Sequence, residues 1–302
     1  MNVTQFRKLF PTGMQMPYDR KLQQDIEARR KDAGGQLFID RVLKALGVTK
    51  AKYPPKSDTG VRQLHQQICE TGMAAHHKFS LLYYVFLDYD LANSDSLPSE
   101  AFAEKSGMPR GYQIFMKGLW HMDREDFSDA LEYITHPSLI ADFADDIITI
   151  LVERAPANDY SLALSYYYSV QPSLKSPKAL EYIFTAMALT NVAEALFFSR
   201  THPEHVREAL FRQLVAKSLE GASAGQAAEH ELAFLPLEKA EEEWLEEYLL
   251  SGEGRNLRKG KDTLLVRKLV SDQFGDIRNL KASGQWGPVL EGIKAGIGGQ
   301  NE

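Results

Sequence analysis

The sequence predicts an all-α fold, either an irregular α-solenoid or a compact bundle of short helical hairpins. Alternating strand-like patterns are nearly absent, whereas apolar residues recur at helical spacing along most of the chain. Proline, glycine and cap-forming residues separate these apolar stripes, so the helices are short. No strict repeat period and no tetratricopeptide signature is present. The chain has 302 residues, of which 44% are hydrophobic, enough for one large domain or two.

The N-terminal third contains several predicted helices. One helix has its apolar face between Leu37 and Leu46 and ends at Gly47, and Pro54-Pro55 breaks the chain after it. A second helix begins at Val61. The next, over residues 76–90, is apolar almost all round, which predicts a central, buried position. A loop then reaches Pro98, and Ser99 is expected to cap a short helix through Phe102.

Residues 115–139 carry the best-defined pattern in the chain. Apolar residues fall into two helical stripes on either side of a charged turn over residues 123–126, which has room for an N-cap. Two short helices so close together must fold back on each other, so a helical hairpin is predicted. Gly118 is expected to let neighbouring helices approach closely, and Trp120, Phe127 and Leu131 to pack. The two stripes are Tyr112, Phe115, Met116, Leu119 and Trp120, and Phe127, Ala130, Leu131 and Ile134.

Cap and first-turn residues punctuate the rest of the core. Proline is tolerated in a first helical turn because the N–H group of that position has no partner. On this basis, helices are predicted to begin at or next to Pro137, Asp159, Ser176-Pro177, Asn191 and Pro203, with a last apolar stripe from Leu237 to Leu249.

The C-terminal segment differs in character from the core. Between residues 255 and 281, eight Lys and Arg residues stand against three Asp, and this basic stretch directly follows an acidic helix over residues 238–247. Leu264, Leu265 and Leu269 suggest an amphipathic helix within it. Three readings stay open: a solvated helix, a partner-binding segment that orders on docking, or a nucleic-acid contact. We expect three regions: an N-terminal helical segment (1–55) that packs on the core, a helical domain (56–250), and a basic, partly flexible tail (251–302).

Composition excludes several classes of protein. The net charge of −6 argues against a nucleic-acid binder that uses its whole surface, so direct nucleic-acid contact is disfavoured. Cys69 is the single cysteine, which fits a reducing compartment. Charged residues interrupt the N-terminus, and no run of about 18 apolar residues occurs, so neither a signal peptide nor a membrane span is expected.

No motif indicates catalysis, a cofactor or a metal, so an enzyme is not expected. His76 and His77 are adjacent, and on a helix they point about 100° apart, too far to form a facial metal pair. The stretch from Gly254 to Lys261 imitates a phosphate-binding loop but has one residue too many between its glycines and no preceding strand.

Partner-binding residues are predicted on the tyrosine-rich helix and in the basic tail. Consecutive tyrosines on a helix cannot all face one core, so some are either at a half-buried edge or in a partner groove. Aromatic and aliphatic side chains carry most interface energy. The candidates are Tyr166, Tyr168, Arg255, Arg258, Lys259, Leu265, Leu269 and Trp286.

Several of these segments, in order, resemble the ELYS-like helical domain of nuclear pore assembly proteins over roughly residues 60–250. The similarity lies in residues 81–89, in Gly118-Leu119-Trp120 with the hairpin that follows, in residues 191–195 with Arg200, and in Leu237 with Glu241-Glu242-Glu243 and Tyr248-Leu249.

The resemblance implies a short form like that seen in fungi. It would be a non-enzymatic structural nucleoporin of the nuclear envelope, docking on the Y-shaped outer-ring scaffold and supporting pore assembly and the transport of protein and mRNA. Chromatin binding cannot be carried over, because the Arg-Gly-Arg-Pro core of a minor-groove hook is absent. The alternative is a helical scaffold or regulatory module of another large assembly, such as a proteasome-lid-like or trafficking complex.

Overall fold

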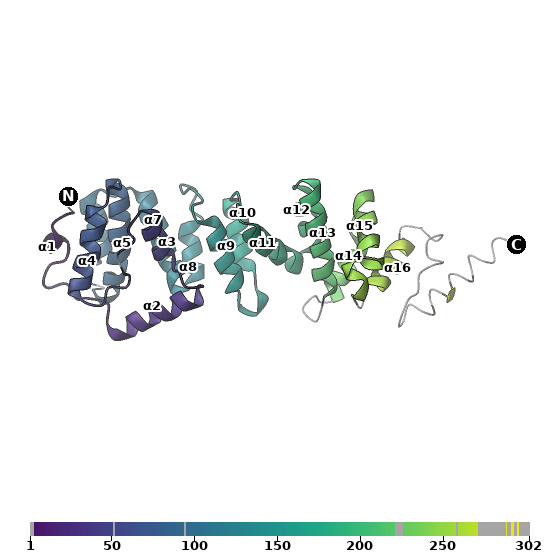
Figure 1. The fold of residues 1–302 in the computed structure, drawn as a ribbon, viewed down its shortest axis with the longest axis horizontal. Helices are drawn as coiled ribbons and strands as arrows, with labels where there is room; N and C mark the ends of the chain where they lie inside the picture. Colours follow the sequence, from purple (N-terminus) through teal and green to yellow (C-terminus); the bar gives the residue numbers. More distant parts are fainter. Residues whose placement is uncertain are drawn as a thin grey trace. The chain divides into compact units, whose positions relative to one another are not determined.

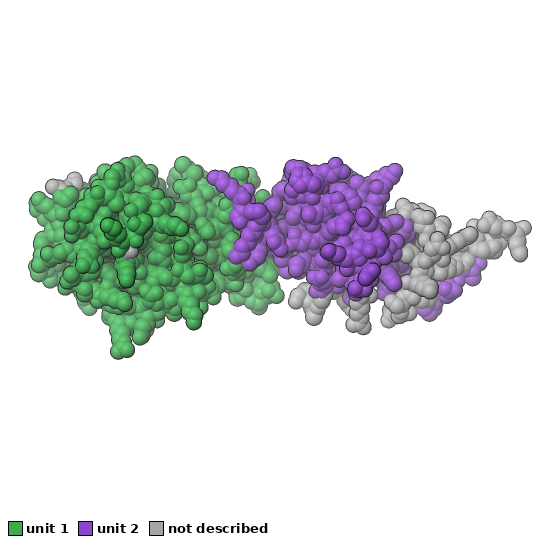
Figure 2. Space-filling model, viewed as in Figure 1, with its two compact units in different colours: residues 1–173 green, residues 174–302 purple. Residues whose placement is uncertain are grey.

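A computed structural model describes residues 3–50, 52–93, 95–220, 226–257 and 259–270, and also residues 288, 291, 292 and 295. Within these residues there are sixteen α-helices, two short 3-10 helices and no strand, so the all-α prediction is confirmed. The chain divides into two compact units, Met1–Ser173 and Leu174–Glu302, which Figure 2 shows in different colours.

Unit 1 is built around α5 (Ala75–Ala92), whose residues 80–89 are all buried. The central position predicted from its apolar sequence is therefore confirmed. Helices α3, α4, α6 and α7 all pack against α5, and α2 packs on α7 (Figure 1). The other helices of the unit are α1 (Phe6–Leu9), α2 (Arg20–Asp32), α3 (Phe38–Ala45), α4 (Asp58–Glu70), α6 (Pro98–Ser106), α7 (Arg110–Arg124), α8 (Phe127–Ile134), α9 (Ala144–Glu153) and α10 (Ser161–Val170).

Helices α7 and α8 form the predicted hairpin. A Cβ atom on Gly118 would lie 2.5 Å from Ile134 Cγ2, so only glycine permits this approach of the two helices. The expected turn begins later than residue 123, because α7 continues to Arg124 and reverses at Glu125, whose φ is 64°.

The predicted short helix capped by Ser99 is placed differently. Helix α6 begins at Pro98, in the first-turn position where a missing N–H group costs nothing, and it runs past Phe102 to Ser106. The Ser99 backbone N–H and hydroxyl groups both donate to the carboxylate of Asp90. Ser99 therefore ties α6 to the end of α5 instead of capping its own helix.

Unit 2 contains α11 (Pro177–Thr190), α12 (Val192–Arg200), α13 (Glu204–Leu219), α14 (Gln226–Phe234), α15 (Lys239–Leu250) and α16 (Gly260–Val270). Two predicted helix starts are confirmed: Pro177 occupies the first turn of α11, and the Asn191 side chain accepts from the Glu194 N–H group at 3.0 Å. Helix α16 packs on α14 and α15 within this unit.

Among the described residues, none of the helices combines the length and hydrophobicity that crossing a bilayer requires.

Candidate interaction site

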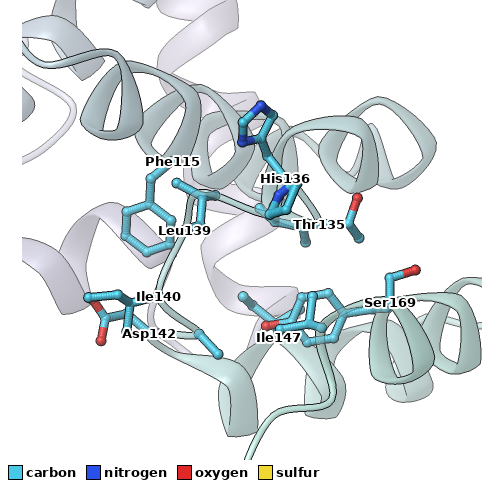
Figure 3. Close-up of a pocket in the computed structure, with 13 residues that line it drawn as sticks. Phe115, Thr135, His136, Leu139, Ile140, Asp142, Ile147 and Ser169 are labelled. Atoms are coloured by element: carbon cyan, nitrogen blue, oxygen red, sulfur yellow. The ribbon is translucent and has the colours of Figure 1, made fainter.

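A groove on unit 1, apolar mainly in its larger cavity, is the strongest candidate for a partner-binding surface. It consists of two adjoining cavities of about 220 Å³ and 340 Å³, both of which are lined by Phe115 and Asp142. In the first cavity, Phe115 and Leu139 lie on one side and Ile147 and Ser169 on the other (Figure 3). The second cavity is lined mainly by α3, α5 and α7.

The segment between α8 and α9 forms one wall of this groove. A helix was expected to start at Pro137, but that prediction is wrong, because α9 begins at Ala144. Residues 135–143 instead form turns, in which Leu139 N–H donates to the His136 carbonyl at 3.0 Å and Asp142 N–H to the Ile140 carbonyl at 2.8 Å. We name residues 135–143 the rim loop.

Phe143 explains why the helix starts late. Its φ of 58° and ψ of 22° are left-handed, which is incompatible with a right-handed helix through this position. Its ring lies 6.4 Å from the ring of Phe115 and 6.4 Å from that of Phe38, so aromatic packing holds this conformation. The sequence signal for the true start was Asp145-Asp146, because acidic residues favour a first helical turn.

Ile140 stands at the edge of the first cavity with 81% of its surface exposed. An aliphatic side chain gains little from this position in water, since burying it would stabilise the protein by about 1.5–3 kcal/mol. Together with the adjoining cavities, Ile140 extends the surface that a docking partner would cover.

Tyr166 and Tyr168, both predicted as partner contacts, have different environments on α10. Tyr166 is 1% exposed and lines the groove from beneath, so its expected place among the exposed tyrosines is wrong. Burial raises the pKa of Tyr166, and Asp142 and Asp145 add to the increase. Tyr168 is 40% exposed and lies outside the lining of the groove. A role for either residue in partner binding stays a prediction.

The predicted contacts of the basic segment have different environments in unit 2. Arg255 is exposed in the 3-10 helix Glu253–Asn256, and Lys259 and Leu269 are half-buried. Leu265 is fully buried, so it is a core residue of unit 2 and not a surface anchor. Arg258 and Trp286 lie outside the described residues. Among the described contacts of this segment, Arg255 is at the surface and Leu265 is in the core, so these two do not share one binding surface.

Two buried carboxylates in unit 1 were missed from the sequence. Asp88 accepts hydrogen bonds from the Tyr18 and Tyr53 hydroxyls, each at 2.7 Å, and from Trp120 Nε1 at 2.9 Å. Burial raises the pKa of Asp88, while these three hydrogen bonds act in the opposite direction. The available signal was a single Asp inside the apolar run over residues 81–89.

Asp123 joins α7 to the beginning of α3. Its carboxylate accepts from the N–H groups of Phe38 (2.6 Å) and Ile39 (2.9 Å) and from the Tyr84 hydroxyl (2.7 Å). Leu37 occupies the N-cap position of α3, and its side chain has no hydrogen-bond acceptor. The Asp123 carboxylate, from α7, therefore accepts the hydrogen bonds of the first N–H groups of α3. Burial raises the pKa of Asp123 to about 7.

Unit 2 has a corresponding buried acid in Glu241. Arg200 binds its carboxylate with Nε at 3.0 Å and Nη2 at 2.7 Å, and Arg207 Nη2 binds it at 2.5 Å. The Glu238 N–H group donates to the same carboxylate at 2.8 Å. Burial alone raises the pKa of Glu241, but these hydrogen bonds outweigh it and hold the pKa below its ordinary value.

Nothing in the described part of the chain groups three or more potential metal ligands. His76 and His77 have ring centroids 4.2 Å apart and lie against Tyr112 without an acidic partner that completes a ligand set. The geometry of the described residues is therefore that of helical packing with an open apolar groove.

Comparison with known proteins gives the family. The family model described as "ELYS: Nuclear pore complex assembly" matches residues 36–252. The chain is similar to the protein ely5 of Schizosaccharomyces pombe, named as uncharacterized, with 26% identity over 162 residues, which is 52% of this chain and 51% of that protein. It is also similar to the human Protein ELYS, with 24% identity over 167 residues, which is 54% of this chain and 7% of the human protein.

The family match covers more than half of the chain and includes helices of both units. It contains the hairpin with its close approach at Gly118 and the buried acids Asp88, Asp123 and Glu241. The chain therefore belongs to the ELYS family of nuclear pore complex assembly proteins.

Proposed function

We propose that this chain is a non-enzymatic structural nucleoporin that docks on the Y-shaped outer-ring scaffold at the nuclear envelope. In that position it would support pore assembly and, through it, the transport of protein and mRNA. The observation that carries the proposal is the family match over residues 36–252, which concerns nuclear pore complex assembly. The matched segments span about half of the fission yeast relative and 7% of the human one, so partners of the whole relatives are not assumed.

The groove beside the rim loop supports docking through surface complementarity. Its Phe115 and Ile147 side chains are apolar, and Ile140 stands exposed at its edge. A partner helix that inserted an apolar side chain between them would also cover Ile140. Interfaces of this kind draw most of their energy from a few buried aromatic and aliphatic side chains.

Co-purification with outer-ring subunits from cells that express the tagged full chain tests the proposal. We expect outer-ring subunits in the purified material and the tagged chain at the nuclear rim. Ile140→Asp should weaken the association by roughly tenfold or more, because it places a charge in the apolar contact. Leu250→Asp is the matched control, since Leu250 is also exposed but belongs to α15 of unit 2 and does not line the groove.

Recovery without any outer-ring subunit, together with diffuse fluorescence, would refute the proposal. If Ile140→Asp and Leu250→Asp retained equal amounts of these subunits, the groove would not be the docking surface. Co-purification with a chain that lacks residues 271–302 tests the predicted role of Trp286 apart from that of the groove. This chain lacks Trp286 but keeps the groove and all of α16.

A further inference from the structure

We propose that a second groove on unit 1, between α6 and α8, binds a basic amphipathic segment of another protein. This inference goes beyond docking on the outer ring and does not depend on it. The groove consists of two adjoining cavities of about 500 Å³ and 380 Å³. Tyr83, Glu100, Lys117 and Tyr133 line both of them, so the two are continuous. We name it the α6/α8 groove.

Apolar side chains lie exposed along this groove. Leu91, at the end of α5, is 45% exposed, and Leu97, directly before α6, is 40% exposed. Both line the second cavity. Tyr83 is buried beneath them, and Tyr133 is half-buried. Two exposed leucines above an aromatic surface can receive the apolar face of a helix.

Leu97 is held in this position by an unfavourable backbone conformation. Its φ is 36° and its ψ is 72°, in the left-handed region, which is unfavourable for a residue with a branched side chain. The hydrogen bonds from Ser99 to Asp90 fix the chain just after it. Strain that keeps an aliphatic side chain in solvent is typical of a binding position and has no use in packing.

The charge of the groove selects the partner. Four exposed carboxylates line it, from Glu100, Glu104, Asp129 and Glu132. None of the four forms an ion pair with any described residue. Complementarity therefore favours lysine and arginine on the partner, next to the apolar residues that contact Leu91 and Leu97.

Two bases already in the groove offset only half of the charge of these four carboxylates. Lys117 Nζ lies 5.0 Å from the centre of the Tyr133 ring, a cation–π contact, and Arg110 is the other base in the lining. The His121 ring is also stacked on the Tyr133 ring, with the two ring centroids 5.4 Å apart. Burial raises the pKa of Tyr83 to about 12, and the nearby Asp90 carboxylate adds to the increase.

Fluorescence anisotropy with the full chain tests the proposal. The probe is a labelled amphipathic peptide of Leu and Lys, and its Leu/Glu counterpart is the charge control. We expect the Leu/Lys peptide to bind and the Leu/Glu peptide to fail. Neutralising two groove carboxylates, Glu100→Gln with Glu132→Gln, should weaken binding roughly fivefold, because two favourable charge pairs with lysines of the peptide are lost.

The matched control is Glu204→Gln with Glu243→Gln. Glu204 lies in the first turn of α13 as Glu100 does in that of α6, and Glu243 is exposed inside α15 as Glu132 is inside α8. Both double variants remove the same net charge, so the control should stay within twofold of the unaltered chain. Leu91→Ala, at an exposed position, should weaken binding without affecting folding.

Two binding results would overturn the proposal. One is equal weakening in the groove and control variants, which would indicate general attraction to an acidic protein. The other is no binding of the Leu/Lys peptide by the unaltered chain. Crosslinks from a photoreactive probe should fall on the residues of α5, α6, α7 and α8 that line the groove, and crosslinks confined to other parts of the chain would contradict the assignment of the groove.

Discussion

Asp123 links the pH dependence of stability to the start of a helix. Its carboxyl pKa rises from 3.8 to about 7 on folding, so the folded state binds the proton more tightly than the unfolded state does. The stabilisation from this group is complete below the unfolded pKa and is lost as the pH rises from about 4 to about 7. The shift corresponds to about 4 kcal/mol as an upper bound.

We expect Asp123→Asn to remove this part of the pH dependence. The amide keeps one acceptor oxygen, so the N–H group of Phe38 or Ile39 loses its partner, which costs about 1–3 kcal/mol. Urea unfolding at several pH values between 4 and 8 measures both effects. Asp58→Asn, at an exposed carboxylate, is the control and should keep the slope of the unaltered chain. An unchanged slope in Asp123→Asn would contradict the assignment.

The contribution of Glu241 to stability depends on pH in the opposite direction to that of Asp123. Its pKa is lowered on folding, so its contribution is present above the unfolded pKa and is lost as the pH falls through the folded value. Glu241→Gln should destabilise the chain by about 2–3 kcal/mol at neutral pH. Removing one partner of a buried ion pair ordinarily costs about 3–5 kcal/mol. The loss is smaller here because Arg207 still binds the Glu238 carboxylate, at 2.7 Å.

Denaturant unfolding of Glu241→Gln at neutral and acid pH measures this effect. The loss should shrink toward acid pH, where Glu241 itself becomes protonated. Glu243→Gln on the same helix, at an exposed position, should change stability by less than about 0.5 kcal/mol. A loss in Glu241→Gln no greater than in this control would refute the role given to the pair with Arg200.

At the scale of elements, the α7–α8 hairpin depends on one close approach. Gly118→Ala places a Cβ atom 2.5 Å from Ile134 Cγ2 and 3.1 Å from Tyr133 Cβ. We expect it to destabilise the chain by about 1–3 kcal/mol, despite the better helix propensity of alanine. Gly111→Ala is the control in the same helix, where nothing lies within 4 Å of the new Cβ.

Thermal unfolding distinguishes the two glycine variants by the sign of the change in stability. Gly111→Ala should be neutral or stabilising by up to about 1 kcal/mol. Combining Gly118→Ala with Ile134→Ala should cost less than the sum of the two single changes, because the clashing methyl group is gone. Strict additivity would show that the close approach is not the source of the destabilisation.

The same hairpin shows how far the sequence predicts the elements. Its two apolar stripes and Gly118 were sufficient to predict two helices that pack closely, since helical spacing and a small residue at a contact are local signals. The central position of α5 followed from the same kind of pattern. The start predicted at Pro137 was wrong, because Phe143 takes a left-handed conformation through aromatic contacts with Phe38 and Phe115.

The candidate site was less predictable than the elements. Ile140 is exposed in the rim loop, and periodicity alone gives no reason to expect a loop over these residues. The pairings of Asp123 with Phe38 and of Arg200 with Glu241 join residues far apart in the sequence, so no local spacing indicates them. Arg200 and Glu241 carry part of the family resemblance. Their buried ion pair gives a physical reason why the fold needs these two residue types at these positions.

On the scale of the whole molecule, each compact unit has its own buried polar network. Asp88 and Asp123 lie in residues 1–173, and Arg200, Arg207 and Glu241 lie in residues 174–302. Each unit also has its own apolar core, centred on α5 in the first and including Phe184, Phe211 and Leu265 in the second. Units with separate cores tend to unfold as separate cooperative transitions.

Differential scanning calorimetry of the full chain tests this expectation. Asp123→Asn should lower the temperature of one transition, and Glu241→Gln that of the other. For units of 129–173 residues, a loss of 2 kcal/mol corresponds to a shift of roughly 4–12 °C, which is large enough to assign each transition to its unit. If both variants shifted a single transition by the same amount, the two units would form one cooperative structure, because a local loss would then be shared by the whole chain.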